Sequence, residues 1–286
     1  MIEPMGKRVS QWGEGPIWWQ GKLYYVDIEN GLVIEHQPDT NAERQWDVSS
    51  QVGRVGTVVP RASGGLIVAG DQGIFSLDTE SGEVSAIADP EPHLSDNRFN
   101  DGKCSPDGRF FAGTISLTKQ QGTAALYRLD KDLSLHTAYS GVTNSNGVAW
   151  SADGKTCYYI DTPRLSVMAF DYHADTGALS NERIVIDTSH IPASPDGMTI
   201  DRDGNLWIAF CHGSCVANFS PTTGEELRRI PLPCLETTAC AFGGELLDEL
   251  YVTTGIHKSE VEPHAGRLFR VTGLGVSGVP ADAFAG

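Results

Sequence analysis

Four polar side chains occupy the same position in a repeated stretch of this chain, and their types suit metal binding. They are Glu14, Asn100, Asn146 and Asp196, and each lies seven or eight residues before a turn glycine that leads into a strand-like segment. Residues at one phase of a radially repeated fold converge on its axis. Two carboxylates and two amides would supply there the oxygen ligands that a hard divalent cation prefers. The pattern therefore predicts a metal site.

Short segments of aromatic and β-branched residues follow these turns and predict an all-β fold. They are residues 23–26, 65–68, 110–112, 157–160, 206–209 and 250–253. The turns before them fall near Gly21, Gly65, Gly108, Gly154, Gly204 and Glu249, so the successive spacings are 44, 43, 46, 50 and 45 residues. A repeat of this length with several strands per unit is typical of propeller blades. We expect one six-bladed β-propeller that spans residues 1–286 as a single domain.

The ring of such a propeller closes when a strand from one end of the chain joins the blade formed by the other end. Closure of this kind protects the sheet edges. We expect Lys7 to Gln11 to pair with Arg267 to Val271 in the last blade. No segment has the periodicity of a long amphipathic helix, which argues against a parallel βαβ sheet.

The charge of the chain excludes several classes of partner. It has 37 acidic and 21 basic residues among 286, a net charge of −16. Like charges repel, so nucleic acid and anionic membranes are not expected as partners. No apolar run approaches the roughly 20 residues of a membrane span, and residues 1–10 lack the apolar core of a signal peptide. We expect a cytoplasmic protein, a monomer or weak dimer, with no membrane partner.

Six cysteines are scattered through strand-like text, which favours free buried thiols in a protein without an export signal. They are Cys104, Cys157, Cys211, Cys215, Cys234 and Cys240. Cys211 and Cys215 flank His212 in a run that could suggest zinc–thiolate ligation. That run lacks a second pair of ligands, so buried thiols remain the preferred interpretation.

The polar residues also allow simpler interpretations than a metal site. Asn146-Gly147 and Asp196-Gly197 could be plain hairpin turns, because Asx-Gly is a common turn signal. Their common phase with Glu14 favours the site instead. Asp101 is expected to support its loop rather than to bind metal. The aspartates within the Asp-Gly turns are expected to be structural, and they are Asp107, Asp153 and Asp203.

Two other sets of residues lie near these motifs. The tryptophans Trp18, Trp150 and Trp207 are expected to pack between blades. The histidines of the late loops are His212, His257 and His264, and the sequence assigns them no role.

Several motifs in order along the whole chain resemble the family of senescence marker protein 30, gluconolactonases and related, regucalcin-like sugar lactonases. The shared text comprises residues 13–18 (GEGPIW), 97–103 (NRFNDGK), 111–114 (FAGT), 146–150 (NGVAW), 158–161 (YYID), 170–172 (FDY), 195–198 (PDGM) and 206–209 (LWIA). Each motif is short, and together they are specific.

The resemblance implies a six-bladed propeller with one catalytic divalent cation in its central channel. Residue by residue, it implies that Glu14, Asn146 and Asp196 ligate the metal. It gives Asp196 the further role of acid/base, and it makes Arg98 and Asn100 contacts to the substrate. The cation would be Ca²⁺ or Zn²⁺ first, with Mg²⁺ and Mn²⁺ as alternatives.

These residues suggest a metal-dependent hydrolase of a sugar-derived lactone, in which the metal polarises the ester carbonyl. The alternatives are hydrolysis of an organophosphate or aryl lactone at the same site, and a non-catalytic calcium-binding or scaffold propeller. One departure from the family concerns the lid at residues 115–121, where animal members carry acidic residues and this chain has no carboxylate. The identity of the lactone therefore stays open.

Overall fold

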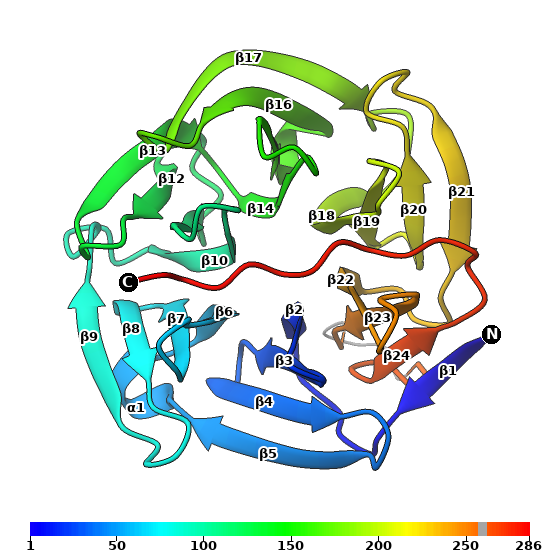
Figure 1. Ribbon diagram of the computed structural model, residues 1–286, viewed down its shortest axis with the longest axis horizontal. Helices are drawn as coiled ribbons and strands as arrows, with labels where there is room; N and C mark the ends of the chain where they lie inside the picture. Colours follow the sequence, from blue (N-terminus) through cyan, green and yellow to red (C-terminus); the bar gives the residue numbers. More distant parts are fainter. Residues whose placement is uncertain (257–261) are drawn as a thin grey trace.

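Six four-stranded antiparallel sheets surround a central axis in the computed structural model, which describes residues 1–256 and 262–286 (Figure 1). Each sheet is one blade, named here after its innermost strand. The innermost strands are β2 (Gly13–Trp19), β6 (Val55–Pro60), β10 (Asn97–Cys104), β14 (Ser145–Trp150), β18 (Ser194–Ile200) and β22 (Thr237–Gly243). The predicted six-bladed β-propeller is confirmed.

The remaining strands follow from the axis outward. The second strands are β3 (Lys22–Asp27), β7 (Leu66–Gly70), β11 (Phe110–Ser116), β15 (Thr156–Asp161), β19 (Leu206–Cys211) and β23 (Glu249–Thr254). The third strands are β4 (Leu32–Gln37), β8 (Gly73–Leu77), β12 (Ala124–Leu129), β16 (Ser166–His173), β20 (Cys215–Phe219) and β24 (Leu268–Val271). The outermost strands are β5 (Ala42–Asp47), β9 (Val84–Ala88), β13 (Leu135–Val142), β17 (Ala178–Asp187), β21 (Glu226–Pro231) and β1 (Ile2–Met5).

Helix is confined to two short segments of the described chain, α1 (Ser49–Val52) and the 3₁₀ turn η1 (Thr162–Arg164). Within those same residues, no helix is long or apolar enough to cross a lipid bilayer. The six segments predicted as strands all lie at the second position of a blade, where β3, β7, β11, β15, β19 and β23 form. Their apolar residues face both neighbouring blades, which explains their strong signal in the sequence.

The ring closes through the N-terminal strand, but with different residues from those predicted. Strand β1 pairs with β24, so that Ile2 lies opposite Val271 and Met5 opposite Leu268. The expected strand at Lys7 to Gln11 was wrong, because Gly6 turns the chain away at a φ of 55°. The observed strand contains Pro4, which lies opposite Phe269. An outermost strand tolerates proline because one of its edges needs no ladder hydrogen bond.

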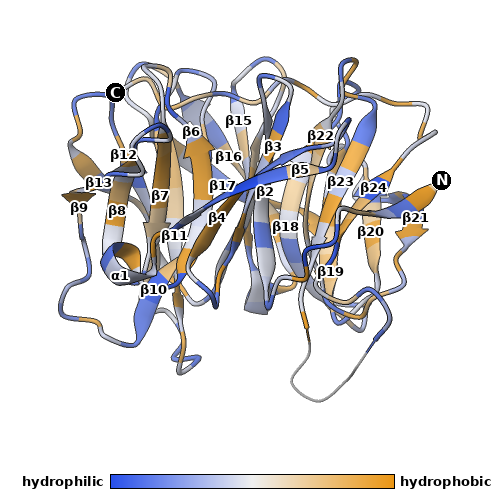
Figure 2. Cartoon of the chain, turned by 90° about the horizontal axis from the view of Figure 1, so that it is seen from below, coloured by the Kyte–Doolittle hydropathy of each residue, from blue (hydrophilic) through white to orange (hydrophobic). Residues whose placement is uncertain are grey.

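Apolar side chains fill the space between blades and exclude water from it. Strand β7 is wholly buried, whereas β5 is mostly exposed and is drawn mainly in the hydrophilic colour in Figure 2. Trp18 stacks on Tyr251 of the β22 blade at a centroid distance of 5.5 Å. Trp150 contacts Phe111 edge-on at 5.2 Å, and Trp207 contacts Phe242 at 5.6 Å, which confirms packing between blades for all three tryptophans. All six cysteines are buried and free, as expected.

The chain after β24 crosses the ring over its centre, as the red segment in Figure 1 shows. Backbone hydrogen bonds anchor it: Arg202 donates to Ser277 at 2.8 Å, and Phe284 donates to Pro60 at 2.8 Å. Residues 279–282 and the C-terminal halves of several inner strands line a cavity of about 350 Å³. This C-terminal strap therefore covers one end of the channel, the end toward which the inner strands run.

We expect the strap to be anchored chiefly by Phe284, whose side chain is fully buried in the core. Replacing Phe284 with Ala should lower the free energy of unfolding by about 3–5 kcal/mol, because it leaves a cavity. Chemical denaturation measures this loss. Leu246→Ala is the control, since Leu246 is 69% exposed and should change stability by less than about 0.5 kcal/mol. Equal effects of the two variants would mean that the strap does not hold the ring.

Candidate metal centre

Every innermost strand carries a β-bulge at the same level. In each blade the pairing between the innermost and second strands shifts by one residue. On the innermost strand the shift lies between residues 14 and 17 in β2, 55 and 57 in β6, 99 and 102 in β10, 145 and 148 in β14, 195 and 198 in β18, and 237 and 239 in β22. Bulges locally bend a strand and re-aim a side chain. Three of the predicted site residues, Asn100, Asn146 and Asp196, lie inside these bulges, and Glu14 directly precedes its own.

The Asx-Gly pairs are therefore parts of strands and not hairpin turns. Gly147 and Gly197 are needed because neighbouring inner strands approach closely behind the site residues. A Cβ atom on Gly147 would lie 2.5 Å from the Cβ of Met198, and one on Gly197 would lie 2.3 Å from the Cβ of Ala239. Glycine at both positions lets three inner strands converge where Asn146 and Asp196 project.

A chain of hydrogen bonds joins the amides of the site. Asn100 Nδ2 donates to the Asn146 Oδ1 at 3.1 Å and to the Ser145 carbonyl at 2.7 Å. Asn146 Nδ2 donates to Thr162 Oγ1 at 2.8 Å, and that hydroxyl donates to the Pro195 carbonyl at 2.9 Å. These bonds fix the direction of the Asn146 amide, so its oxygen faces Asn100 with a second lone pair still available.

The carboxylates of Glu14 and Asp196 are buried close enough to repel one another. Glu14 is 4% exposed and Asp196 is 7% exposed. Burial and then repulsion from Asp101 raise the pKa of Glu14 to about 8, although a hydrogen bond from the Gly15 N–H opposes the shift. Burial, followed by the charges of Glu14, Asp101 and Glu236, raises the pKa of Asp196 well above its usual value.

Asp101 is the third buried carboxylate of this region. Its Oδ1 accepts a hydrogen bond from the Gly102 N–H at 2.7 Å, which agrees with the predicted support of the loop. Burial raises its pKa, and the Lys103 ammonium opposes that shift. Lys103 Nζ, on β10, donates to the Met198 carbonyl of β18 at 2.8 Å. Asp101 is thus a third buried carboxyl group near the axis, whereas the sequence had predicted only a structural role for it.

Arg98 is buried beside the amides. Its Nη1 donates to the Phe99 carbonyl and to Asn100 Oδ1, both at 2.8 Å. Its Nε is buried and has no hydrogen-bond partner among the residues that the structure describes. Burial, followed by the charge of Arg54, lowers the pKa of Arg98 to about 10. A buried guanidinium with one unused donor is suited to bind a polar ligand, because leaving a buried donor without a hydrogen bond costs free energy.

The donor set fits a divalent cation. Glu14 and Asp196 offer carboxylate oxygens, Asn146 offers an amide oxygen, and all three lie on inner strands at the bulge level. Desolvated carboxylates that repel one another are stabilised by a shared cation. Two cationic side chains of this region, Lys103 and Arg98, direct donors to the Met198 and Phe99 carbonyls. Oxygen-only ligands suit hard ions best.

The lid begins beside Arg98, since Ile115 pairs with Arg98 across β10 and β11. Residues 117–122 are exposed. A carboxylate from another segment, Glu91, is hydrogen-bonded at the base of this region. It accepts from Tyr127 Oη at 2.8 Å, Asn97 Nδ2 at 3.0 Å and Thr114 Oγ1 at 3.1 Å. The base of the lid is thus held by an acidic residue that lies outside residues 115–121.

Comparison with known proteins identifies the family to which this constellation belongs. Residues 12–256 match the family model described as the SMP-30/Gluconolactonase/LRE-like region. The chain belongs to this family.

Members of the SMP-30/gluconolactonase family from distant organisms align along the whole chain. Regucalcin from Danio rerio is 38% identical over 294 residues, covering 100% of this chain and 98% of regucalcin. A solved luciferin-regenerating enzyme superposes with a TM-score of 0.91 at 32% identity, covering 100% of this chain and 99% of the other. A calcium-binding protein, regucalcin, from Agrobacterium tumefaciens superposes with a TM-score of 0.90 at 24% identity, covering 97% and 95%, which supports the fold alone.

Two residues that the sequence did not predict also act on the site. Thr162 orients Asn146, and Glu236 acts electrostatically on Asp196. Thr162 lies in η1 and Glu236 precedes β22, so neither shares the phase of the four predicted residues. Their type and spacing carried no clue, because contacts between different blades depend on how the ring closes.

The remaining polar predictions concern turns and late loops. Asp107 accepts from Ser105 Oγ at 2.8 Å, and Asp153 accepts from Ser151 Oγ at 2.6 Å, which confirms their structural role. His264 lies in a turn and contacts Phe269 edge-on at 6.5 Å. His212 lies beside Glu236. His257 is outside the described residues.

In metal-free protein, the raised pKa of Glu14 should make folding stability depend on pH. The folded pKa of about 8 exceeds the ordinary value of 4.5, so the folded state binds this proton more tightly than the unfolded state. The stability is therefore fully present below about pH 4.5 and is lost as the pH rises toward about 8. Thermal unfolding of metal-stripped wild type and Glu14→Gln across this range should show a smaller loss in the variant.

The matched control for this experiment is Glu80→Gln, because the Glu80 side chain is 92% exposed. This variant should lose stability with pH as steeply as wild type does. A Glu14→Gln profile that also runs parallel to wild type would contradict the electrostatic description of the site.

Proposed function

We propose that this protein is a metal-dependent hydrolase that opens the ester of a sugar-derived lactone, as a gluconolactonase does. The observation that carries the proposal is the convergence of Glu14, Asn146 and Asp196 at one level of the channel, beside the polar donors of Arg98 and Asn100. Membership of the SMP-30/gluconolactonase family supports a lactonase-type function.

Glu14, Asn146 and Asp196 would hold the cation. When bound there, a divalent ion supplies Lewis acidity to the ester carbonyl and lowers the pKa of a water. The oxygen-only donor set favours Ca²⁺ or Mg²⁺, whereas Zn²⁺ and Mn²⁺ also accept such ligands. The solved regucalcin with a TM-score of 0.90 is described as a calcium-binding protein, which agrees with Ca²⁺ as the first candidate.

Asp196 would move the proton of the reaction. As water attacks the carbonyl carbon, one carboxylate oxygen of Asp196 takes a proton from it. Asp196 then returns this proton to the ring oxygen as the carbon–oxygen bond of the lactone breaks, and the product is a hydroxy acid. Burial raises the pKa of the Asp196 carboxyl in the metal-free protein, and a cation bound beside it would oppose this shift and keep the carboxylate ionised as a base.

Arg98 and Asn100 would orient the substrate through donors matched to hydroxyl groups. Arg98 Nε supports this role, because it is buried and lacks a hydrogen-bond partner among the described residues. The C-terminal strap covers the opposite end of the channel, so the lactone would reach the site from the end where the inner strands begin. Polar donors at that end favour a polyol lactone over an aryl lactone or organophosphate.

Replacing Asp196 with Asn should lower kcat by about 10²–10⁴-fold, the usual contribution of a general acid–base. The assay is proton release during hydrolysis of aldono-γ- and δ-lactones by metal-stripped protein, with Ca²⁺, Mg²⁺, Mn²⁺ or Zn²⁺ added back. Asp203→Asn is the matched control, because Asp203 is an exposed aspartate in the hairpin turn of the same blade. If no cation restores turnover of any lactone in wild type, the hydrolase proposal is wrong.

Replacing Arg98 with Lys should raise KM for a polyhydroxylated lactone while changing the KM for an unsubstituted lactone little. Lysine keeps the positive charge but loses the planar fork of donors. Loss of one charge-assisted hydrogen bond corresponds to about 10–100-fold in kcat/KM. Lys119→Gln in the exposed lid is the control, since it alters a charge away from the amides. Equal losses for both lactones would argue against hydroxyl recognition by Arg98.

A further inference from the structure

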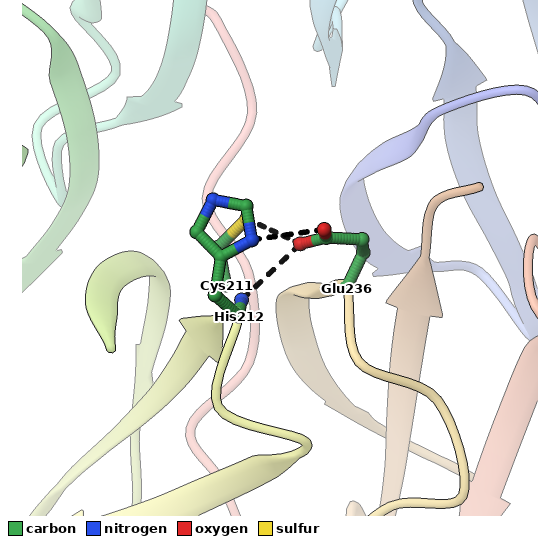
Figure 3. A group of neighbouring side chains, drawn as sticks. All are labelled: Cys211, His212 and Glu236. Atoms are coloured by element: carbon green, nitrogen blue, oxygen red, sulfur yellow. Dashed lines mark hydrogen bonds and ion pairs between the residues drawn. The ribbon is translucent and has the colours of Figure 1, made fainter. Parts of the chain in front are cut away.

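A second group of metal-binding side chains lies at the same end of the ring as Asp196. Cys211 ends β19, His212 follows it in the turn toward β20, and Glu236 directly precedes β22. Where β18 pairs with β19, Cys211 lies opposite Ser194. Ser194 is two residues before Asp196 in the chain. The three side chains therefore come from the β18 and β22 blades and meet across the boundary between them, as Figure 3 shows.

The side chains of this cluster point at one another. Cys211 Sγ donates to Glu236 Oε2 at 2.9 Å, and His212 Nδ1 lies 2.9 Å from Glu236 Oε1. The backbone N–H of His212 also donates to Glu236 Oε2, at 3.2 Å. One ligand atom from each residue lies within 4.8 Å of the other two. Figure 3 shows the thiol and the imidazole on one side and the carboxylate facing them.

Burial and backbone conformation hold the cluster in place. Glu236 is fully buried and Cys211 is 8% exposed, whereas the His212 side chain is 52% exposed. His212 has a φ of 63°, which is uncommon for a residue other than glycine and costs conformational energy. The turn thus has a strained backbone at His212, and its imidazole Nδ1 lies against a buried carboxylate.

We propose that Cys211, His212 and Glu236 form a second metal site, which takes Zn²⁺ or a similar borderline-soft divalent cation. Sulfur, imidazole nitrogen and carboxylate oxygen are the three ligand types that zinc accepts in proteins. Among residues 1–256 and 262–286 the cluster supplies three protein ligands, and tetrahedral zinc takes a fourth ligand as well. This proposal does not depend on the lactonase function.

Charge and protons balance when the cation binds. The Cys211 thiol gives up one proton to the solvent, and thiolate and carboxylate then neutralise the two positive charges. His212 would bind as a neutral imidazole through Nδ1 with its proton on Nε2, and the side-chain hydrogen bonds to Glu236 would be replaced by bonds to the metal. A neutral complex suits this position, because Glu236 is fully buried.

The two sites should differ in the ions that they select. Glu14, Asn146 and Asp196 offer oxygen alone, whereas the cluster contributes a sulfur and a nitrogen ligand. Thiolate and imidazole strongly favour Zn²⁺ and Co²⁺ over Ca²⁺ and Mg²⁺. Ca²⁺ should therefore not displace a cation from the cluster.

The test is a titration of metal-stripped, reduced protein with Co²⁺ while the near-ultraviolet thiolate-to-cobalt charge-transfer absorption is recorded. Wild type should show this absorption, release one proton for each Co²⁺ bound at the cluster, and lose the signal when Zn²⁺ is added. Excess Ca²⁺ should leave the absorption unchanged. Cys211→Ser should abolish the absorption.

Three further variants separate the cluster from its surroundings. Cys215→Ser is the matched control, because this buried thiol begins β20 directly after the turn and its Sγ instead contacts Arg229 Nη1 at 3.6 Å. It should keep the absorption. Glu14→Gln, which alters the oxygen site, should also keep it, so failure of either site can be recognised separately. His212→Gln, at a half-exposed position that tolerates substitution, should weaken Co²⁺ binding at least about tenfold.

The proposal is overturned if folded wild type gives no thiolate-to-cobalt absorption, or if Cys211→Ser retains it. The cluster would then be only a set of hydrogen bonds that joins two blades. Circular dichroism of each variant establishes that it is folded, so that loss of absorption reports loss of a ligand.

Discussion

The bulge shared by all six innermost strands is the constraint on which the site depends. A regular strand would direct alternate side chains to the two neighbouring blades, and the polar residues of the site would face apolar packing. One extra residue in each inner strand re-aims Asn100, Asn146 and Asp196 at the same level. Close approach at Gly147 and Gly197 then brings these strands together. The arrangement concentrates buried negative charge that a cation can stabilise.

The two ends of the channel serve different purposes because the inner strands all run in the same direction. Several of them carry polar residues near the bulge, as β2, β14 and β18 do, and end with apolar side chains, as β2 does at Trp18. The C-terminal strap covers the apolar end and buries Phe284 in the core. Arg98, Asn100 and the lid lie at the other end. A rigid apolar half and a polar half with unused hydrogen-bonding capacity agree with a small polar substrate.

Electrostatics links the proposed metal centre to the cluster of Cys211, His212 and Glu236. The charge of Glu236 raises the pKa of Asp196, and burial together with the charges of Asp196 and Glu236 raises the pKa of the Cys211 thiol. A cation at either position would weaken this repulsion for both. The proposed oxygen site and the proposed soft site would therefore influence one another across the boundary between two blades.

The sequence by itself determined the blade count, the second strands and the common phase of Glu14, Asn100, Asn146 and Asp196, because these features are local and repeat along the chain. It failed for the closing strand, which is Ile2–Met5 and not Lys7 to Gln11, and it gave no role to Thr162 or Glu236. Only the tertiary structure decided which residues meet between blades. Such contacts join positions with no regular spacing, and closure of the ring, through many weak packing interactions, fixes them.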